Sequence, residues 1–247
     1  MAGQVKQLGI GALGRFQDVP IATHDRVIAA NLIGHMHDAH AVLPIFLRQG
    51  HGTFVNMISV GGFLATPFSA AYSASKFGLR GFSQALRGEL SLHPRIHVCD
   101  IYPTFVDTPG LAHAGNYVGK RLSVPPGVLD PRTVAAAVVR LADRPRNTTV
   151  VGAPAPLLVA VQALAPNLGA AVLNGFLSTY FRKTDPAPTT EGALFDAGEG
   201  GAVDGGFRDP DRGRKVAFAG GLGLAALAAG GLAWWTARRP RSQIKRA

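Results

Sequence analysis

The chain has 247 residues and a formal net charge of +10, with 47% hydrophobic and 16% charged residues. This composition excludes an intrinsically disordered protein, and the length allows one α/β domain with an appendage. The single cysteine, Cys99, excludes a disulfide framework and is expected to be a buried thiol within a strand.

The positive charge is concentrated at the C-terminal end. From Arg208 onward there are nine basic and two acidic residues, so this stretch carries +7 of the net +10. Such clustering favours a segment that flanks a membrane over a nucleic-acid groove, and we expect no nucleic-acid partner. The first residues, MAGQVKQLGIGALG, contain no apolar run of signal-peptide length, which predicts that the protein is not secreted.

Apolar periodicity predicts an α/β fold with a parallel sheet covered on both faces. Residues 1–20 are Gly-rich and are interpreted as a loop. The expected helices run from Thr23 to the stop at Gly50, from Ala71 to Leu90 and from Pro131 to about Ala142. The expected strands are Thr53–Ile58, Arg95–Tyr102 and Thr148–Val151, which gives only three strands.

The C-terminal part divides into three further segments after a domain over residues 1–183. Residues 184–215 contain seven Gly and three Pro and are predicted to be a flexible linker. Val216–Trp235 is a run of twenty residues without charge, long enough as a helix to cross a bilayer core of about 30 Å. Two tryptophans end this uncharged run, and residues 236–247 after it form a basic tail. A single transmembrane helix over Val216–Trp235 is therefore expected.

Two side chains at helical spacing carry the chemistry that the sequence predicts. Tyr72 and Lys76 are four residues apart in a helix and therefore share one face. An ammonium next to a phenol is expected to lower the pKa of the phenol, so that Tyr72 can exchange a proton with a substrate oxygen. Ser59, at the end of the preceding strand, places a hydroxyl where it can hydrogen-bond to the same oxygen.

The surrounding string NMISVGGFLATPFSAAYSASKFGLRGFSQALRGEL resembles the short-chain dehydrogenase/reductase family, and the resemblance covers roughly residues 5–152. It implies that Tyr72 is the catalytic acid/base, that Lys76 also holds the nicotinamide ribose, and that Ser59 orients the substrate carbonyl. It further assigns a proton path to Asn31 in AANLIGHMHDAH. In YPTFVDTP, it assigns contacts with the nicotinamide of NAD or NADP to three residues, namely Pro103, Val106 and Thr108.

The family's Gly-rich phosphate-binding turn has no counterpart in this chain. Gly9, Gly11 and Gly14 spell G-x-G-x-x-G, but the motif requires a strand before it and a helix after it, and we reject it as a phosphate loop. The predicted fold is therefore a partial Rossmann-like sheet whose N-terminal nucleotide-binding strands are missing. Two consequences are expected: poor cofactor binding, and an unpaired edge on the strand Thr53–Ile58.

Two functions remain open at this point. The first is an NAD(P)-dependent oxidoreductase that interconverts an alcohol and a ketone or aldehyde, with a small and lipophilic substrate. The second is an inactive, truncated and membrane-tethered homologue that dimerises through the helices Thr23–Arg48 and Ala71–Leu90. Both readings place the domain on the cytoplasmic side of a membrane as a single-pass protein. No metal is expected, because His35, His37 and His40 do not share one helical face.

Overall fold

The computed structural model describes residues 3–6, 9–124, 127–152, 164, 166–196 and 202–208. The predicted membrane span 216–235 and the basic tail 236–247 lie outside these residues. Among the helices within the described ranges, none combines the length and the apolar character that a membrane crossing needs.

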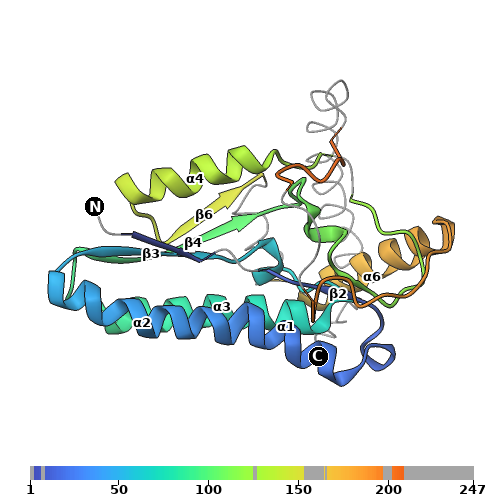
Figure 1. Ribbon diagram of the computed structural model, residues 1–247, viewed down its shortest axis with the longest axis horizontal. Helices are drawn as coiled ribbons and strands as arrows, with labels where there is room; N and C mark the ends of the chain where they lie inside the picture. The colour runs from blue at the N-terminus through green and yellow to red at the C-terminus, as the bar shows by residue number, and fades with distance from the viewer. Residues whose placement is uncertain are drawn as a thin grey trace, which may run out of the picture.

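A parallel sheet forms the centre of the molecule, with the strand order β1-β3-β4-β6 (Figure 1). Its strands are β1 (Gly3–Lys6), β3 (Gly52–Met57), β4 (Ile96–Pro103) and β6 (Thr148–Val151). All of its strand pairs are parallel, so the carboxyl ends of the strands meet at one edge. The expected Rossmann-like α/β class is thus present, and the three expected strands are found to within one or two residues.

The strand count and the predicted free edge were wrong. Residues 3–6 form β1, which pairs with β3 over four positions from Gly3 opposite Thr53 to Lys6 opposite Asn56. The edge of β3 that we expected to be unpaired is therefore covered. The short strand escaped the sequence analysis because four residues inside a Gly-rich stretch show no apolar periodicity of their own.

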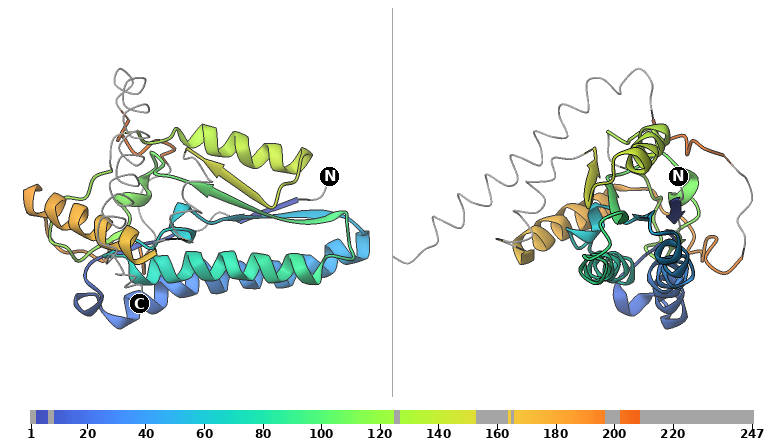
Figure 2. Two further views of the ribbon diagram at one scale, coloured as in Figure 1. Left: turned by 180° about the vertical axis from the view of Figure 1, so that it is seen from behind. Right: turned by 90° about the vertical axis from the view of Figure 1, so that its left-hand side faces the viewer.

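The helices cover both faces of the sheet (Figures 1 and 2). One face carries α2 and α3, which lie side by side in both views of Figure 2, and the other carries α4. The helical bounds are α1 (Ile21–Ile28), a π-helical turn η2 (Ala29–Ile33), α2 (Gly34–Gln49), α3 (Ala70–Glu89), α4 (Pro131–Asp143) and α6 (Pro166–Lys183). The Asp130 carboxylate caps α4 by accepting from Arg132 N at 2.8 Å.

Two apolar layers hold the helices on the sheet. On the α2/α3 side, Phe54 and Val98 pack with Phe46 of α2 and Leu86 of α3. On the α4 side the neighbouring strand residues face the other way, and this layer consists of Val55, Met57, Cys99, Ile101, Val134, Ala137 and Leu141. This alternation places the two core clusters on opposite faces. The expected burial of Cys99 is confirmed, since its side chain is 1% exposed.

Part of the predicted linker packs against the domain. A second, two-stranded sheet joins β2 (Ala12–Leu13) to β5 (Gly115–Asn116), and Asn116 exchanges two backbone hydrogen bonds with Thr190. Leu194 is 1% exposed and packs with Ala12 in a small apolar cluster. The Gly and Pro content of residues 184–215 therefore reflects turns that fit onto the domain surface in the parts that the structure describes.

Candidate active site

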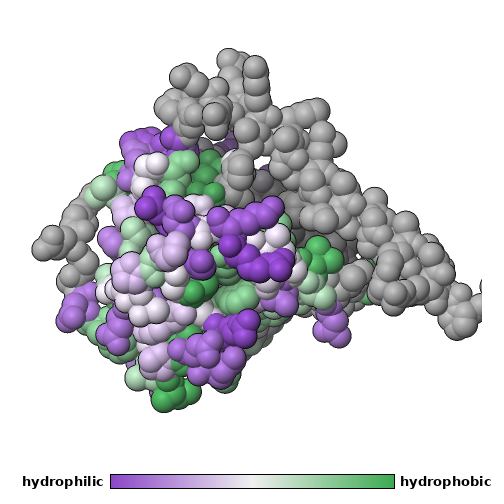
Figure 3. Space-filling model, turned by 90° about the vertical axis from the view of Figure 1, so that its right-hand side faces the viewer, coloured by the Kyte–Doolittle hydropathy of each residue, from purple (hydrophilic) through white to green (hydrophobic). Residues whose placement is uncertain are grey.

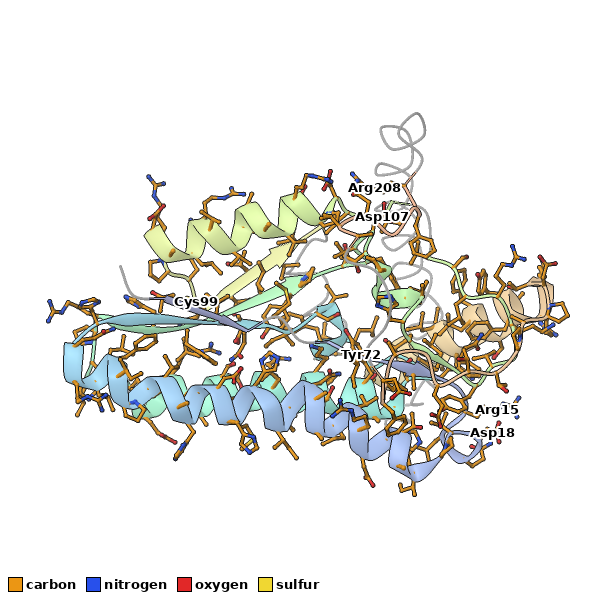
Figure 4. The ribbon with its side chains drawn as sticks, in the orientation of Figure 1. Arg15, Asp18, Tyr72, Cys99, Asp107 and Arg208 are labelled. Atoms are coloured by element: carbon orange, nitrogen blue, oxygen red, sulfur yellow. The ribbon has the colours of Figure 1, made fainter. Side chains whose placement is uncertain are left out.

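The candidate site lies at the carboxyl edge of the sheet, where α3 begins. Tyr72 is in the first turn of α3 and Lys76 is one turn later. Figure 4 shows Tyr72 at the end of the sheet to which the strands point. Lys76 is 1% exposed and Tyr72 is half-buried, so the pair sits at the boundary between the core and the surface. Open α/β sheets bind their ligands at this edge.

Ser59 reaches the same place from β3. It follows the strand by two residues and begins the short 3-10 helix η3 (Val60–Gly62), where its hydroxyl accepts from Gly61 N at 3.1 Å. Its backbone has φ 151° and ψ 159°, a conformation that side-chain-bearing residues rarely adopt. The hydroxyl also hydrogen-bonds to Tyr72. The structure thus brings Ser59, Tyr72 and Lys76 together, as the sequence predicts.

Lys76 carries its ammonium group into the core. Its Nζ donates to Met57 O at 3.1 Å and lies 5.6 Å from the centroid of the Tyr72 ring. Burial lowers the pKa of Lys76 from 10.5 to about 8. The strand β3 therefore holds the Lys76 side chain in place, and the ammonium loses its proton at a lower pH than that of an ordinary lysine.

The expected lowering of the Tyr72 pKa does not occur in this structure. Burial raises the pKa of Tyr72, and the hydrogen bond with Ser59 opposes this rise without cancelling it. The ammonium of Lys76 lies over the face of the Tyr72 ring. It donates a hydrogen bond to Met57 O in the strand β3. The loss of solvation by the Tyr72 phenol therefore has a larger effect on its pKa than the attraction to the Lys76 ammonium that the four-residue spacing suggested.

Asn31 joins two segments that lie beside the site. It is fully buried within the π-helical turn η2, and its amide exchanges two hydrogen bonds with the backbone of Ile10, N to Oδ1 at 2.9 Å and Nδ2 to O at 2.8 Å. A third bond joins Nδ2 to Ser75 Oγ at 3.2 Å. Asn31 therefore fastens the segment after β1 to α3, and the proton path expected for it stays a prediction.

The sequence analysis missed the role of Gly9 and Gly11. A Cβ atom added to Gly9 would lie 3.8 Å from Lys76 Nζ, and one added to Gly11 would lie 3.8 Å from the Tyr72 ring. These two glycines therefore lie next to the pair. They follow the carboxyl end of β1, the place where a ligand-facing loop is expected once β1 is known to be a strand.

The loop after β4 completes the site with the three residues that the resemblance assigned to the nicotinamide. Pro103 ends β4, Val106 forms a bridge with Leu129, and Thr108 N donates to Val106 O at 2.9 Å. These residues lie on one loop at the carboxyl edge, as expected. Their contacts with a cofactor stay predictions.

Asp107, between Val106 and Thr108, is a buried charge that the sequence analysis did not single out. Its side chain is 2% exposed. Burial raises the pKa of this carboxyl, but hydrogen bonds from Phe207 N and from the Arg208 side chain and backbone outweigh it, so the pKa falls below its usual value.

Seen from the carboxyl edge, the described surface mixes polar and apolar residues (Figure 3).

A parallel α/β sheet with a serine, a tyrosine and a lysine at its carboxyl edge defines a class of dinucleotide-fold oxidoreductases. The family model described as "short chain dehydrogenase" matches residues 4–116. This segment contains all but the first residue of β1, the three site residues and the loop after β4. Over residues 4–116 the chain is thus similar to short-chain dehydrogenases.

Individual relatives show the same similarity. The chain is 27% identical to the "Uncharacterized oxidoreductase YxnA" of Bacillus subtilis, over 96% of this chain and 68% of the relative. It is 30% identical to the 3-ketodihydrosphingosine reductase of Bos taurus, over 53% of this chain but only 40% of the relative. The chain thus spans two thirds of one of these relatives and well under half of the other.

Solved structures share the fold. A short-chain dehydrogenase from Burkholderia cenocepacia in complex with NADP superposes with a TM-score of 0.59, at 21% identity over 70% of this chain and 68% of that chain. A short-chain dehydrogenase from Streptomyces avermitilis gives 0.52 at 22% identity over 72% of this chain and 66% of that chain. The Rossmann-like architecture of the described residues is therefore that of known short-chain dehydrogenases.

Proposed function

We propose that this protein is an NAD(P)-dependent oxidoreductase that interconverts an alcohol and a ketone or aldehyde. The observation that carries the proposal is the convergence of Ser59, Tyr72 and Lys76 at the carboxyl edge of the sheet, beneath the Gly9–Gly11 segment. A hydroxyl donor, a proton-exchanging phenol and a buried ammonium are groups that can bind a carbonyl oxygen and supply its proton during reduction.

Tyr72 would exchange the proton with the substrate oxygen. Its raised pKa means that the phenol is protonated at neutral pH, which suits the donation of a proton during carbonyl reduction. Ser59, hydrogen-bonded to Tyr72, would hold the carbonyl oxygen against the phenol. Lys76 would stabilise the phenolate that remains, and its pKa of about 8 lets it take part in returning a proton from solvent to that phenolate.

The residues present fit the nicotinamide end of a dinucleotide. Gly9 and Gly11 bring a backbone without side chains next to Lys76 and Tyr72, and Lys76 offers donors to a ribose hydroxyl. Val106 and Thr108 would contact the carboxamide from the loop after β4. The bound cofactor would supply the hydride, while these residues bind and orient it.

The proposal extends to a lipophilic substrate and to membrane association. The uncharged segment 216–235 would keep the domain at a bilayer, and one relative is named a 3-ketodihydrosphingosine reductase. Helix α6 adds apolar side chains at the carboxyl edge of the sheet, among them Phe176, which is 58% exposed. A long-chain ketone presented from a membrane is therefore the substrate class that we propose.

A direct test uses the full chain in mild detergent with NADPH or NADH and a panel of short- and long-chain ketones. We expect cofactor oxidation with a long-chain ketone, and Tyr72→Phe should lower the rate by about 10²–10⁴-fold because the acid/base group is lost. Tyr117→Phe is the matched control, since the hydroxyl of Tyr117 bonds to Thr23 rather than to Ser59, Tyr72 or Lys76. No turnover with any carbonyl or alcohol in the panel, or near-normal turnover by Tyr72→Phe, would refute the proposed mechanism.

A further inference from the structure

A short segment near the end of the described chain lies against the loop after β4. We call Asp204–Arg208 the strap. Arg208 comes 101 positions after Asp107 in the sequence, yet Figure 4 shows the two side chains next to each other at the carboxyl edge of the sheet. The strap therefore contacts the same loop that carries Val106 and Thr108.

The strap satisfies the buried carboxylate of Asp107 almost completely. Phe207 N donates to Oδ1 at 2.8 Å, while Arg208 donates to Oδ2 from its backbone N at 3.2 Å and from its Nε at 3.0 Å. Asp107 is 2% exposed and Arg208 is 31% exposed. A carboxylate this deeply buried is stable in place only while its charge is compensated by such donors.

The backbone of the strap also fits closely onto the loop. Gly205 N donates to Asp107 O at 3.1 Å, and a Cβ atom at Gly205 would come within 2.4 Å of Thr108 O. Only glycine permits this approach. The strap thus contacts the backbone of the loop at Asp107 and Thr108 as well as the Asp107 side chain.

The opposite side of the loop rests on residues 129–130. Asp107 N donates to Leu129 O at 2.9 Å, and Leu129 N donates to Phe105 O at 2.8 Å. Arg208 reaches this side too, because its Nη1 bonds to Asp130 at 2.6 Å. A single guanidinium therefore ties together the strap, the loop and the N-terminus of α4.

We propose that Arg208 is a positioning residue that fixes the 103–108 loop in the conformation that receives the nicotinamide end of the cofactor. This inference rests on the proposed function, which places Val106 and Thr108 against the carboxamide. Without the guanidinium, the Asp107 carboxylate would lose one donor of three and its charge partner. The loop would then turn the carboxylate toward water and lose its alignment with the site.

The test compares Arg208→Gln with Arg132→Gln in the full chain. Arg132 is the matched control because it pairs with Asp130 and Asp204, as Arg208 does, but makes no contact with Asp107. Hydrogen exchange of the Asp107 and Thr108 amides should accelerate about tenfold or more in Arg208→Gln, as expected when a charge-assisted hydrogen bond is lost. Arg132→Gln should leave it unchanged.

Titration with NADH and with NADPH gives the second readout. We expect the dissociation constant to rise about tenfold in Arg208→Gln, and Arg208→Lys to restore part of the loss because it keeps the charge but not the forked donor. Gly205→Ala, which keeps every charge, should weaken cofactor binding as well by pushing the strap off Thr108.

Each outcome has one meaning. Unchanged exchange of the loop amides in Arg208→Gln overturns the inference, and so does faster exchange with unchanged cofactor affinity. Wild-type protein that binds neither NADH nor NADPH overturns the proposed function, and the inference with it. Wild-type binding that Arg208→Gln weakens while Arg132→Gln does not supports both.

Discussion

Lys76 places an ammonium group where the molecule admits almost no solvent, and this carries a cost in stability. Its pKa in the folded protein is about 8, against 10.5 for an ordinary lysine. The unfolded chain therefore binds more protons between these two values, so the free energy of unfolding should rise with pH across that window. Lys76→Met should stabilise the full chain at pH 7 by up to about 3 kcal/mol while abolishing activity, with the gain disappearing near pH 11. Urea unfolding at both pH values measures this difference.

The control for this comparison is Lys183→Met, which removes an exposed lysine at the end of α6 and should leave the stability unchanged. A Lys76→Met variant that is less stable than wild type at pH 7 would show that the hydrogen bond to Met57 O contributes more than desolvation costs.

Helices α2 and α3 lie side by side on one face of the sheet, and α2 leaves apolar side chains exposed to solvent. Ile33 at the end of η2 and Met36 and Leu47 of α2 are 42%, 43% and 45% exposed. Met36 and Leu47 share a helical face because they are eleven residues apart. We propose that this surface joins two copies of the chain. Met36→Asp should convert a dimer to a monomer in sedimentation velocity, because a charge in an apolar interface loses its solvation. Leu92→Asp, at an 88% exposed position beyond the end of α3, should not.

At the scale of the whole molecule, the sequence beyond Arg208 predicts a membrane anchor that the described residues do not include. The full chain should stay with membranes after carbonate extraction. Leu224→Arg combined with Leu227→Arg should release it, since each arginine at the centre of a span costs about 2.5–3.5 kcal/mol on insertion. A wild-type chain released by carbonate would show that residues 216–235 are not a transmembrane helix.

The sequence by itself was sufficient for everything that depends on local periodicity. It predicted the helix that carries Tyr72 and Lys76, because residues four apart share a face of any α-helix. It also predicted three of the parallel strands and their buried faces, because short apolar runs bounded by Gly or Pro are typical of buried strands. Ser59 could be assigned to the site because it follows a strand whose carboxyl end faces the start of that helix.

Only the tertiary structure decided which distant segments meet. The pairing of β1 with β3, the packing of Leu194 and the contact between Arg208 and Asp107 join residues that no local pattern relates. The direction of the Tyr72 pKa also required the fold, since it depends on how much water the surrounding elements exclude from the phenol. Local spacing records which side chains share a face, whereas burial and charge compensation are properties of the assembled chain.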